Sequence, residues 1–494
     1  MLKQAHPFFF FSLVVSLMVF CSNFPMLALI LWLALPVFTA LFYPNKKSYL
    51  KKLFYFTALI IIWLPFNVYP LVLRLLKNIE VSPTVGAILI DNRRLLLVLC
   101  GIIFLVIYYF SVKSIFGAVP YLTSDASFKQ TLRQSFKITK GHFLKAYLPF
   151  LSCGIFLWLL KWFELFTLDH LRSAFSLSLF STIYVFIEAS ILVVASDKIL
   201  KLNSFKWSTL KKIRPWFSLL LFSVMFLGQL YLTADFIQAP FSKRPLIISH
   251  RGVDGKNGVQ NTIEALEKTH ASARPNYVEL DLHETLDQRF VVSHDPDLRQ
   301  LAHKNILIKD YPLDTLTTYK LTENKRQAHL ASFDNYLTEA EKLKQPLLIE
   351  LKVTSEDEAQ VTHNFMRLYL KKISDVNEFH SMNLKAIEKL KHSAPKVRAG
   401  YILPFAFFSF TKVDVNFYSL DQRTATTDYI KKAHQAGKKV YLWTLETPTQ
   451  ALNAWALGAE GVITDRPSLL KQTLMKAKKV DLLRARAKLY VRQF

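Results

Sequence analysis

The chain has 494 residues, enough for two or more domains, and 51% of them are hydrophobic, with 40 phenylalanines. The formal net charge is +25, but much of the positive charge flanks apolar segments, where it acts as a topology signal, and we therefore exclude nucleic-acid binding. The three cysteines, Cys21, Cys100 and Cys153, lie in apolar segments, which excludes a disulfide framework or a thiolate metal site in the C-terminal half.

Long apolar blocks dominate residues 1–237 and predict a multi-pass α-helical membrane domain. A helix that crosses a bilayer needs roughly 20 predominantly apolar residues, and about seven segments approach that length. The candidate spans are Pro7–Cys21, Met26–Tyr43, Leu53–Leu73, Leu95–Phe110, Phe143–Trp162, Phe175–Val194 and Trp216–Ala234. These segments show no buried charged pair that would suggest a transport path.

Lysine and arginine are concentrated in alternate loops of this region, at 46–52, 113–140 and 198–214. Because cytoplasmic loops carry the excess of positive charge, we expect these loops on the cytoplasmic side of the cell membrane. An odd number of spans then places the C-terminal half on the extracytoplasmic side, and an even number would reverse this.

Residues 238–244 read as a short polar linker, after which β-rich runs alternate with helical stretches over residues 245–470. This alternation is typical of a (β/α)8 TIM barrel. The candidate strands are Leu246–Ser249, Tyr277–Asp281, Phe290–Ser293, Leu347–Leu351, Asn377–Ser381, Val397–Ile402, Asn416–Leu420, Val440–Thr444 and Gly461–Thr464.

Nine candidate strands are one more than such a barrel holds. Only eight residues separate Asp281 from Phe290, too few for a crossover between parallel strands. We therefore expect a hairpin here, which rises above the barrel and brings His294 back to its mouth.

Charged side chains fall mainly at the ends of the predicted strands, where barrel enzymes keep their active sites. Glu279 and Asp281 are two residues apart on one strand and so point the same way, and Glu350 and Lys352 repeat this arrangement. Three carboxylates without a thiolate suit a hard cation. The sequence therefore predicts one divalent cation, Mg²⁺ or Ca²⁺, at Glu279, Asp281 and Glu350.

His250 and His294 suit a proton-transfer pair, and Arg251 and Lys352 suit a phosphate, because they supply charge-assisted donors. A lone histidine is more often structural, and Trp443 alone is most often a core residue. The combination nevertheless predicts metal-assisted cleavage of a phosphate ester. The histidines interpreted as structural or surface residues are His270, His283, His303, His329, His380 and His434.

Several short motifs occur in a fixed order between Pro245 and Pro467. They are His250-Arg251-Gly252, Asn261-Thr262, Glu279-Leu280-Asp281, Val291-Val292-Ser293-His294-Asp295, Glu350-x-Lys352, Trp443-Thr444 and Gly461-Val462-Ile463-Thr464-Asp465-Arg466-Pro467. In the order and residues of these motifs, the chain resembles the glycerophosphodiester phosphodiesterase family. Its apolar N-terminal half looks like the membrane domain of some bacterial members.

The resemblance implies a barrel that hydrolyses glycerophosphodiesters to sn-glycerol 3-phosphate and an alcohol. The residues it assigns are His250 and His294 for acid–base catalysis, Arg251, Lys352 and Trp443 for the substrate and its phosphate, and Glu279, Asp281 and Glu350 for the metal. Three positions depart from the family pattern. Gln260 stands where a glutamate usually precedes Asn-Thr, Glu446 stands where an asparagine follows Trp-Thr-x, and Gln288 stands where a glycine usually follows Asp287.

Two other functions fit the same residues. One is a lysophospholipase D acting on lysophospholipids in the bilayer, and the other is a non-catalytic sensor or transporter that only binds a glycerophosphodiester. Because both histidines and all proposed ligands are present, we expect an enzyme whose partners are its substrate and a lipid bilayer.

Residues 471–494 read as a basic helix or tail, either resting on anionic lipid or forming the last barrel helix with a solvated basic face.

Overall fold

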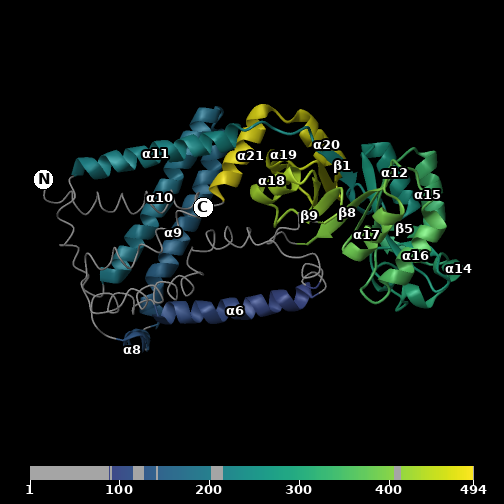
Figure 1. Ribbon diagram of the computed structural model, residues 1–494, viewed down its shortest axis with the longest axis horizontal. Helices are drawn as coiled ribbons and strands as arrows, with labels where there is room; N and C mark the ends of the chain where they lie inside the picture. The colour runs from purple at the N-terminus through teal and green to yellow at the C-terminus, as the bar shows by residue number, and fades with distance from the viewer. Residues whose placement is uncertain are drawn as a thin grey trace. The chain divides into compact units, whose positions relative to one another are not determined.

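The computed structural model describes Ile88 and residues 92–114, 127–140, 143–201, 215–404 and 413–492. These residues belong to two compact units (Figure 1). The helical unit contains Arg94–Ala239 and the chain from Arg486 onward, and the barrel unit contains Pro240–Ala485.

Among the residues described before the barrel, five helices are present: α6 (Arg93–Ser114), α8 (Phe128–Thr139), α9 (Phe143–His170), α10 (Ala174–Lys201) and α11 (Pro215–Gln238). The N-terminus of α8 is fixed by a capping box, in which Ser127 and Gln130 satisfy each other's backbone N–H groups. Helix α10 packs against both α9 and α11, and a hydrogen bond of 3.1 Å joins the hydroxyls of Thr182 on α10 and Thr233 on α11.

The expected membrane spans are not supported by the part of the chain that the structure describes. Across these residues, no helix is both long enough and apolar enough to cross a bilayer. The predicted spans Pro7–Cys21, Met26–Tyr43 and Leu53–Leu73 lie outside the described residues.

A cluster of charged side chains lies between two of these helices. The ammonium of Lys161 on α9 lies 3.2 Å from a carboxylate oxygen of Glu164 and 3.1 Å from one of Glu188 on α10. Glu164 is fully buried. The sequence pattern missed this cluster because Lys161 and Glu188 are 27 residues apart and meet only when two helices pack together.

The basic C-terminal segment forms two helices, α20 (Pro467–Lys476) and α21 (Lys479–Val491). From Arg486 onward it packs within the helical unit. Arg486 donates to the carbonyls of Ile237 and Ala239, and Lys488 pairs with Asp169. Two cations at this end of the tail, Arg486 and Lys488, therefore have partners inside the protein.

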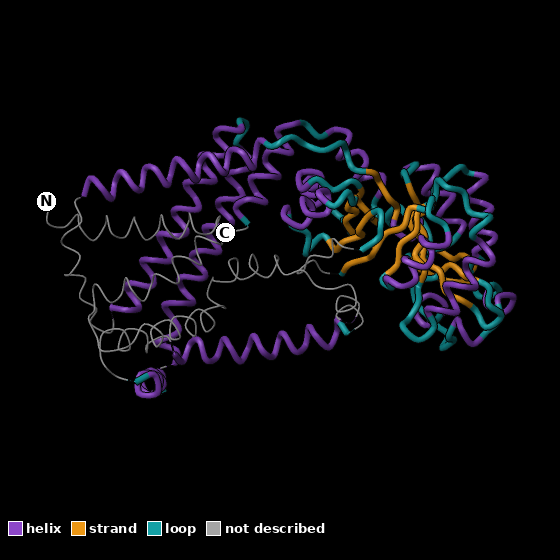
Figure 2. The backbone as a smooth tube through the Cα atoms, in the orientation of Figure 1, coloured by secondary structure: helices purple, strands orange, loops and turns teal. Residues whose placement is uncertain are grey.

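The barrel unit follows with its strands gathered at the centre and helices around them (Figure 2). The strands are β1 (Leu246–Ser249), β2 (Tyr277–Glu284), β3 (Phe290–Val292), β4 (Lys320–Glu323), β5 (Arg326–His329), β6 (Leu347–Leu351), β7 (Glu378–Ser381), β8 (Arg398–Leu403), β9 (Phe417–Asp421), β10 (Lys439–Trp443) and β11 (Gly461–Thr464). The helices are η5 (His250–Gly252), α12 (Ile263–Ala273), α13 (Arg299–Ala302), η6 (Ile308–Asp310), α14 (Leu313–Leu316), α15 (Phe333–Lys342), α16 (Glu358–Tyr369), α17 (Leu384–Ser393), α18 (Thr427–Gln435) and α19 (Pro448–Leu457).

Eight of the strands form the predicted parallel barrel. Their order is β1-β11-β10-β9-β8-β7-β6-β2, and pairing of β1 with β2 closes it. The predicted hairpin is confirmed, since β3 pairs antiparallel with β2. A second hairpin, β4–β5, was not predicted.

The interior of the barrel below its mouth is filled by large apolar side chains. Five buried residues contact one another there: Ile248, Leu348, Phe417, Tyr441 and Ile463. The ring of Phe417 stacks on that of Tyr441 with centroids 4.5 Å apart. The centre is thus a packed core rather than a pore, and the chemistry is left to the strand ends.

Gly400 on β8 leaves the space that Phe417 occupies. A Cβ at this position would lie 2.1 Å from a ring carbon of Phe417, so Gly400→Ala must displace a ring inside a packed core. We expect a loss of about 1–3 kcal/mol in the free energy of unfolding, measured by urea denaturation of the full chain. The exposed substitution Lys396→Ala serves as the control, and equal stability of the two variants would contradict this packing.

Candidate active site

Strand register gathers the polar side chains at the barrel mouth. Asp281 on β2 pairs with Glu350 on β6, and Glu350 pairs with His380 on β7. Three adjacent parallel strands therefore present an acid, an acid and an imidazole at one level, and alternation places Glu279 on the same face as Asp281.

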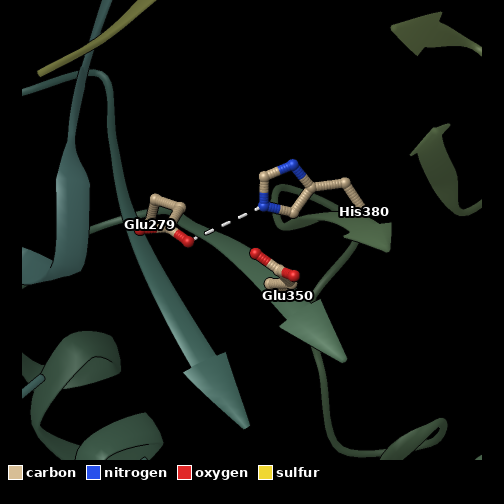
Figure 3. A group of neighbouring side chains, drawn as sticks. All are labelled: Glu279, Glu350 and His380. Atoms are coloured by element: carbon tan, nitrogen blue, oxygen red, sulfur yellow. Dashed lines mark ion pairs between the residues drawn. The ribbon is translucent and has the colours of Figure 1, made fainter. Parts of the chain in front are cut away.

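Glu279, Glu350 and His380 form a group that could hold a metal ion (Figure 3). One ligand atom from each lies within 4.8 Å of the others, and all three residues are buried. The Nε2 atom of His380 lies 3.8 Å from Glu279 and has no hydrogen-bond partner among the described residues. Its other ring nitrogen contacts the hydroxyl of Ser419 at 2.9 Å, which fixes the ring.

The electrostatics of this group favour a cation. Burial raises the pKa of Glu350, and the charges of Asp281 and Glu279 raise it further against the opposing effect of Lys352. Buried carboxylates that repel one another in this way are stabilised when a cation binds them. The donor set thus fits a divalent ion.

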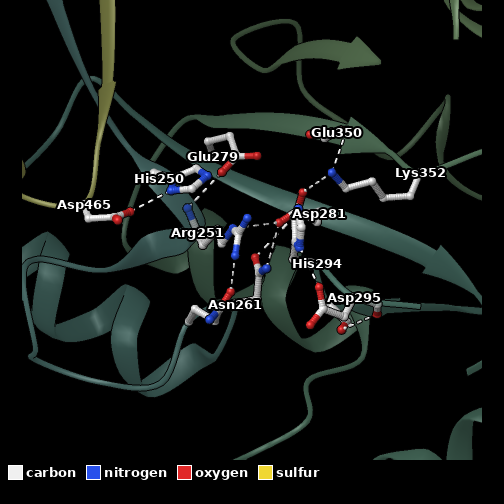
Figure 4. Close-up of polar contacts among 12 residues, drawn as sticks. His250, Arg251, Asn261, Glu279, Asp281, His294, Asp295, Glu350, Lys352 and Asp465 are labelled. Carbon is white, nitrogen blue, oxygen red and sulfur yellow. Dashed lines mark hydrogen bonds and ion pairs between the residues drawn. The ribbon is translucent and has the colours of Figure 1, made fainter. Parts of the chain in front are cut away.

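The carboxylate of Asp281, which was predicted to bind the metal, contacts other side chains. Its carboxylate accepts a hydrogen bond from Asn261 at 2.9 Å and lies 2.9 Å from the ammonium of Lys352 (Figure 4). Although burial opposes ionisation, Lys352, His294 and Arg251 hold the pKa of Asp281 well below its usual value. The structure therefore places Asp281 beside the metal group, with its oxygens directed to these partners.

Lys352 lies between two carboxylates. Its ammonium is 2.7 Å from Glu350 as well as 2.9 Å from Asp281. Burial alone would lower the pKa of Lys352, but the two negative charges outweigh it and raise the pKa. The side chain stays cationic at neutral pH.

Arg251 follows β1 in a left-handed backbone conformation, with φ of 52°. Its backbone N–H donates to Glu279 at 2.8 Å, which ties the turn to β2. The guanidinium lies 3.6 Å from Asp281 and donates to the side-chain oxygen of Gln260. A non-glycine residue in this region is strained and is held by its surroundings.

His250 is paired with Asp465, which follows β11. The Nδ1 of His250 lies 2.6 Å from a carboxylate oxygen of Asp465. Because a carboxylate only accepts, Nδ1 carries the hydrogen and Nε2 is the free acceptor. Burial opposes protonation of His250, but the bond to Asp465 and the charge of Glu279 outweigh burial and raise its pKa.

His294 is paired in the same manner with its neighbour. Its Nδ1 lies 2.8 Å from the carboxylate of Asp295. The Nε2 of His283 contacts the carbonyl of His294 at 3.1 Å, and burial lowers the pKa of His283. A neutral His283 therefore fixes the backbone that carries His294.

All eight predicted site residues line one cavity of about 260 Å³. Its remaining lining includes His380 and Thr444 and an apolar group: Met382, Ile402, Pro404 and Ile463. The indole nitrogen of Trp443 is buried and has no hydrogen-bond partner among the described residues. The cavity thus has a charged side and an apolar side.

Sequence reasoning missed two side chains of this site. His380 was set aside as a structural or surface residue, and nothing around it in the sequence marks it as a ligand. Asp465 was included in the last of the ordered motifs, directly after the predicted strand Gly461–Thr464, but was given no role. Only the strand register and the closure of the barrel bring them to the cavity.

The barrel is similar in sequence to known proteins. Residues 250–469 match the Glycerophosphoryl diester phosphodiesterase family. The rat protein named Lysophospholipase D GDPD1 is 23% identical over 272 residues, which cover 46% of this chain and 85% of that protein.

Solved structures with similarity to the chain include two phosphodiesterases. One is an Oleispira antarctica phosphodiesterase in complex with sn-glycerol-3-phosphate, with a TM-score of 0.43, 20% identity and coverage of 47% of this chain and 97% of that one. The other is a glycerophosphodiester phosphodiesterase from Parabacteroides distasonis, with a TM-score of 0.42, 22% identity and coverage of 47% and 98%. Residues 250–469, which include the barrel strands from β2 onward, thus form a domain of the Glycerophosphoryl diester phosphodiesterase family, and the chain is a hydrolase.

Proposed function

We propose that the barrel hydrolyses glycerophosphodiesters to sn-glycerol 3-phosphate and an alcohol, with two histidines as acid and base. One observation carries the proposal: His250, His294, Arg251 and Lys352 line the same cavity as the group that could hold a metal. This arrangement offers cationic donors for a phosphate and two separate proton carriers around it.

Arg251 and Lys352 bind the phosphate in this proposal. Both side chains are charged and partly reach the cavity, where their donors can follow negative charge on the phosphate oxygens. Asp281 holds Lys352 in place, and its negative charge lies 3.6 Å from the guanidinium of Arg251.

The histidines move the protons. Asp465 and Asp295 each hold an Nδ1, which leaves each Nε2 free to exchange a proton with substrate. One imidazole accepts the proton of the attacking hydroxyl or water, and the other protonates the leaving oxygen. The charge of Asp465 stabilises His250 when it is protonated.

A divalent cation held by Glu279 and Glu350 would neutralise charge on the phosphate oxygens. Two further side chains bear on its identity. With Asp281 the donor set is all oxygen, which suits Mg²⁺ or Ca²⁺, whereas His380 adds a nitrogen that suits a transition ion such as Zn²⁺.

A lysophospholipase D activity is a second candidate. The apolar side of the cavity, with Met382, Ile402 and Pro404, suits an aliphatic part of a substrate. A relative also carries this activity in its name.

We also propose a location at the cell membrane with the barrel on the extracytoplasmic side. The exposed aromatic residues of the helical unit, such as Trp158, Trp162 and Tyr231, would suit contact with lipid.

The first test is release of sn-glycerol 3-phosphate from glycerophosphocholine by the full-length protein. We expect EDTA to abolish release and an added divalent ion to restore it, because the buried carboxylates need a cation. Choline release from lysophosphatidylcholine, measured in parallel, would identify the lysophospholipase D activity. Binding of glycerophosphocholine without turnover would leave a sensor or transporter.

The identity of the metal is tested with His380→Gln. If His380 binds the ion, this substitution weakens Zn²⁺ restoration of activity by at least roughly tenfold in apparent affinity and leaves Mg²⁺ or Ca²⁺ restoration less affected. Metal titration of the apoprotein by calorimetry gives the affinities. Unchanged affinities for all three ions would remove His380 from the ligand set.

Removal of either histidine should prevent turnover. His250→Ala or His294→Ala is expected to lower kcat by roughly 10²-fold or more, since general acid–base groups contribute about that much. Circular dichroism and thermal unfolding establish that the variants fold. His303→Ala, an exposed histidine outside the cavity, is the matched control, and wild-type turnover in either active-site variant would reject the assignment.

The pH dependence reports the pair of His250 and Asp465. Asp465 raises the pKa of His250, so Asp465→Asn lowers it. The limb of the pH profile of kcat/KM that reports His250 should therefore move to lower pH by about one pH unit. This direction holds whether His250 is the acid or the base, and a limb that stays in place would show that Asp465 does not act on His250.

A further inference from the structure

The hairpin β4–β5 lies outside the barrel sheet, yet it brings a carboxylate to the side chain that holds Arg251. Glu323 at the end of β4 accepts two hydrogen bonds from Gln260: one from the backbone N–H at 2.9 Å and one from Nε2 at 2.7 Å. The side-chain oxygen of Gln260 accepts a hydrogen bond from Nη1 of Arg251. The amide of Gln260 thus connects the carboxylate of Glu323 with the guanidinium of Arg251.

We propose that Glu323 is a positioning residue, which acts through Gln260 to hold the guanidinium of Arg251 in its phosphate-binding orientation. The inference rests on the proposed function, in which Arg251 binds the substrate phosphate.

The side chain of Arg251 has few other restraints. Its Nε lies 3.6 Å from Asp281, beyond hydrogen-bond distance, and is buried without a hydrogen-bond partner among the described residues. The main chain is fixed separately, through the bond to Glu279 and a bond of 2.8 Å from the N–H of Asn261 to the carbonyl of Arg251. The direction of the guanidinium therefore depends on Gln260, and its remaining donors stay available for a phosphate.

The position of Glu323 is itself fixed by apolar packing. Leu321, two residues earlier on the same face of β4, is 1% exposed and belongs to a buried cluster with Val259, Val291 and Ala328. Val259 directly precedes Gln260. One small core thus holds both ends of the contact between the hairpin and the loop that follows η5.

The donor and acceptor directions of these hydrogen bonds explain why an amide stands at position 260. Gln260 offers an acceptor to Arg251 and donors to Glu323, so all three side chains are matched. A carboxylate at 260 would face the carboxylate of Glu323 and repel it. If the carboxylate and the amide exchanged places, the pattern of donors and acceptors would be restored, with the negative charge now directly on Arg251.

This exchange provides the test. In Glu323→Gln an NH2 group replaces one of the two acceptor oxygens and faces a donor of Gln260, and the charge is lost. We expect kcat/KM for glycerophosphocholine to fall by roughly tenfold, mainly through KM, as for other residues that orient a ligand-binding side chain. In the Gln260→Glu single variant, kcat/KM should fall by a similar factor. The double variant Gln260→Glu/Glu323→Gln should return to within about threefold of wild type.

The control is Lys325→Gln, which removes an exposed charge from the turn of the same hairpin and should leave kinetics unchanged. Thermal unfolding of every variant shows whether the fold is kept. If Glu323 only fastens the hairpin, Glu323→Gln lowers the unfolding temperature while kcat/KM stays at the wild-type value, and the proposal is overturned. A folded double variant that is no better than the single variants also overturns it.

A failure of the proposed function can be told apart from a failure of the role given to Glu323. If the wild-type protein hydrolyses no glycerophosphodiester, calorimetric titration with sn-glycerol 3-phosphate tests the same contact. The dissociation constant should rise by roughly tenfold in Glu323→Gln and recover in the double variant. Equal affinities in all variants would reject the role of Glu323 whatever the reaction is.

Discussion

The ammonium of Lys352, between the carboxylates of Asp281 and Glu350, is the interaction on which the rest of the site depends. Three carboxylates, those of Glu279, Asp281 and Glu350, are buried at the end of the barrel above a layer of apolar side chains. Removing a charge from water is costly unless a partner compensates it. Lys352 compensates part of the charge of Asp281 and of Glu350, Asp281 in turn lies near Arg251, and Glu279 together with Glu350 keeps negative charge for a metal cation.

The barrel supplies this arrangement through register rather than through any single loop. Parallel pairing sets Asp281, Glu350 and His380 at one level, and Phe417, Tyr441 and Leu348 form the apolar layer beneath. Since each side chain projects from a strand that is paired on both sides, the site is rigid before substrate arrives. His250 and His294 differ from these strand residues, because each depends on a carboxylate partner to fix its ring.

The barrel could be predicted from the sequence because its strands are short, apolar and spaced by amphipathic helices, and because eight residues are too few for a parallel crossover after Asp281. The β4–β5 hairpin could not, since Arg326, Gln327 and His329 give it little of the alternation of a half-buried strand. The eight predicted site residues share one cavity, but His380 carries no local signal and depends on pairing with β6. Long-range partners such as Lys161 and Glu188 were missed for the same reason.

The path of the chain through the helical unit has a consequence for its synthesis. The hydroxyl of Tyr490 on α21 accepts hydrogen bonds from Gln229 and Thr233 on α11, and Lys161 on α9 donates to the carbonyl of Val491. The barrel unit is thus inserted, in sequence, between parts of one packed structure. On the ribosome, α9 and α11 emerge more than 200 residues before these partners, so the helical unit is completed only after the barrel has been translated and can fold.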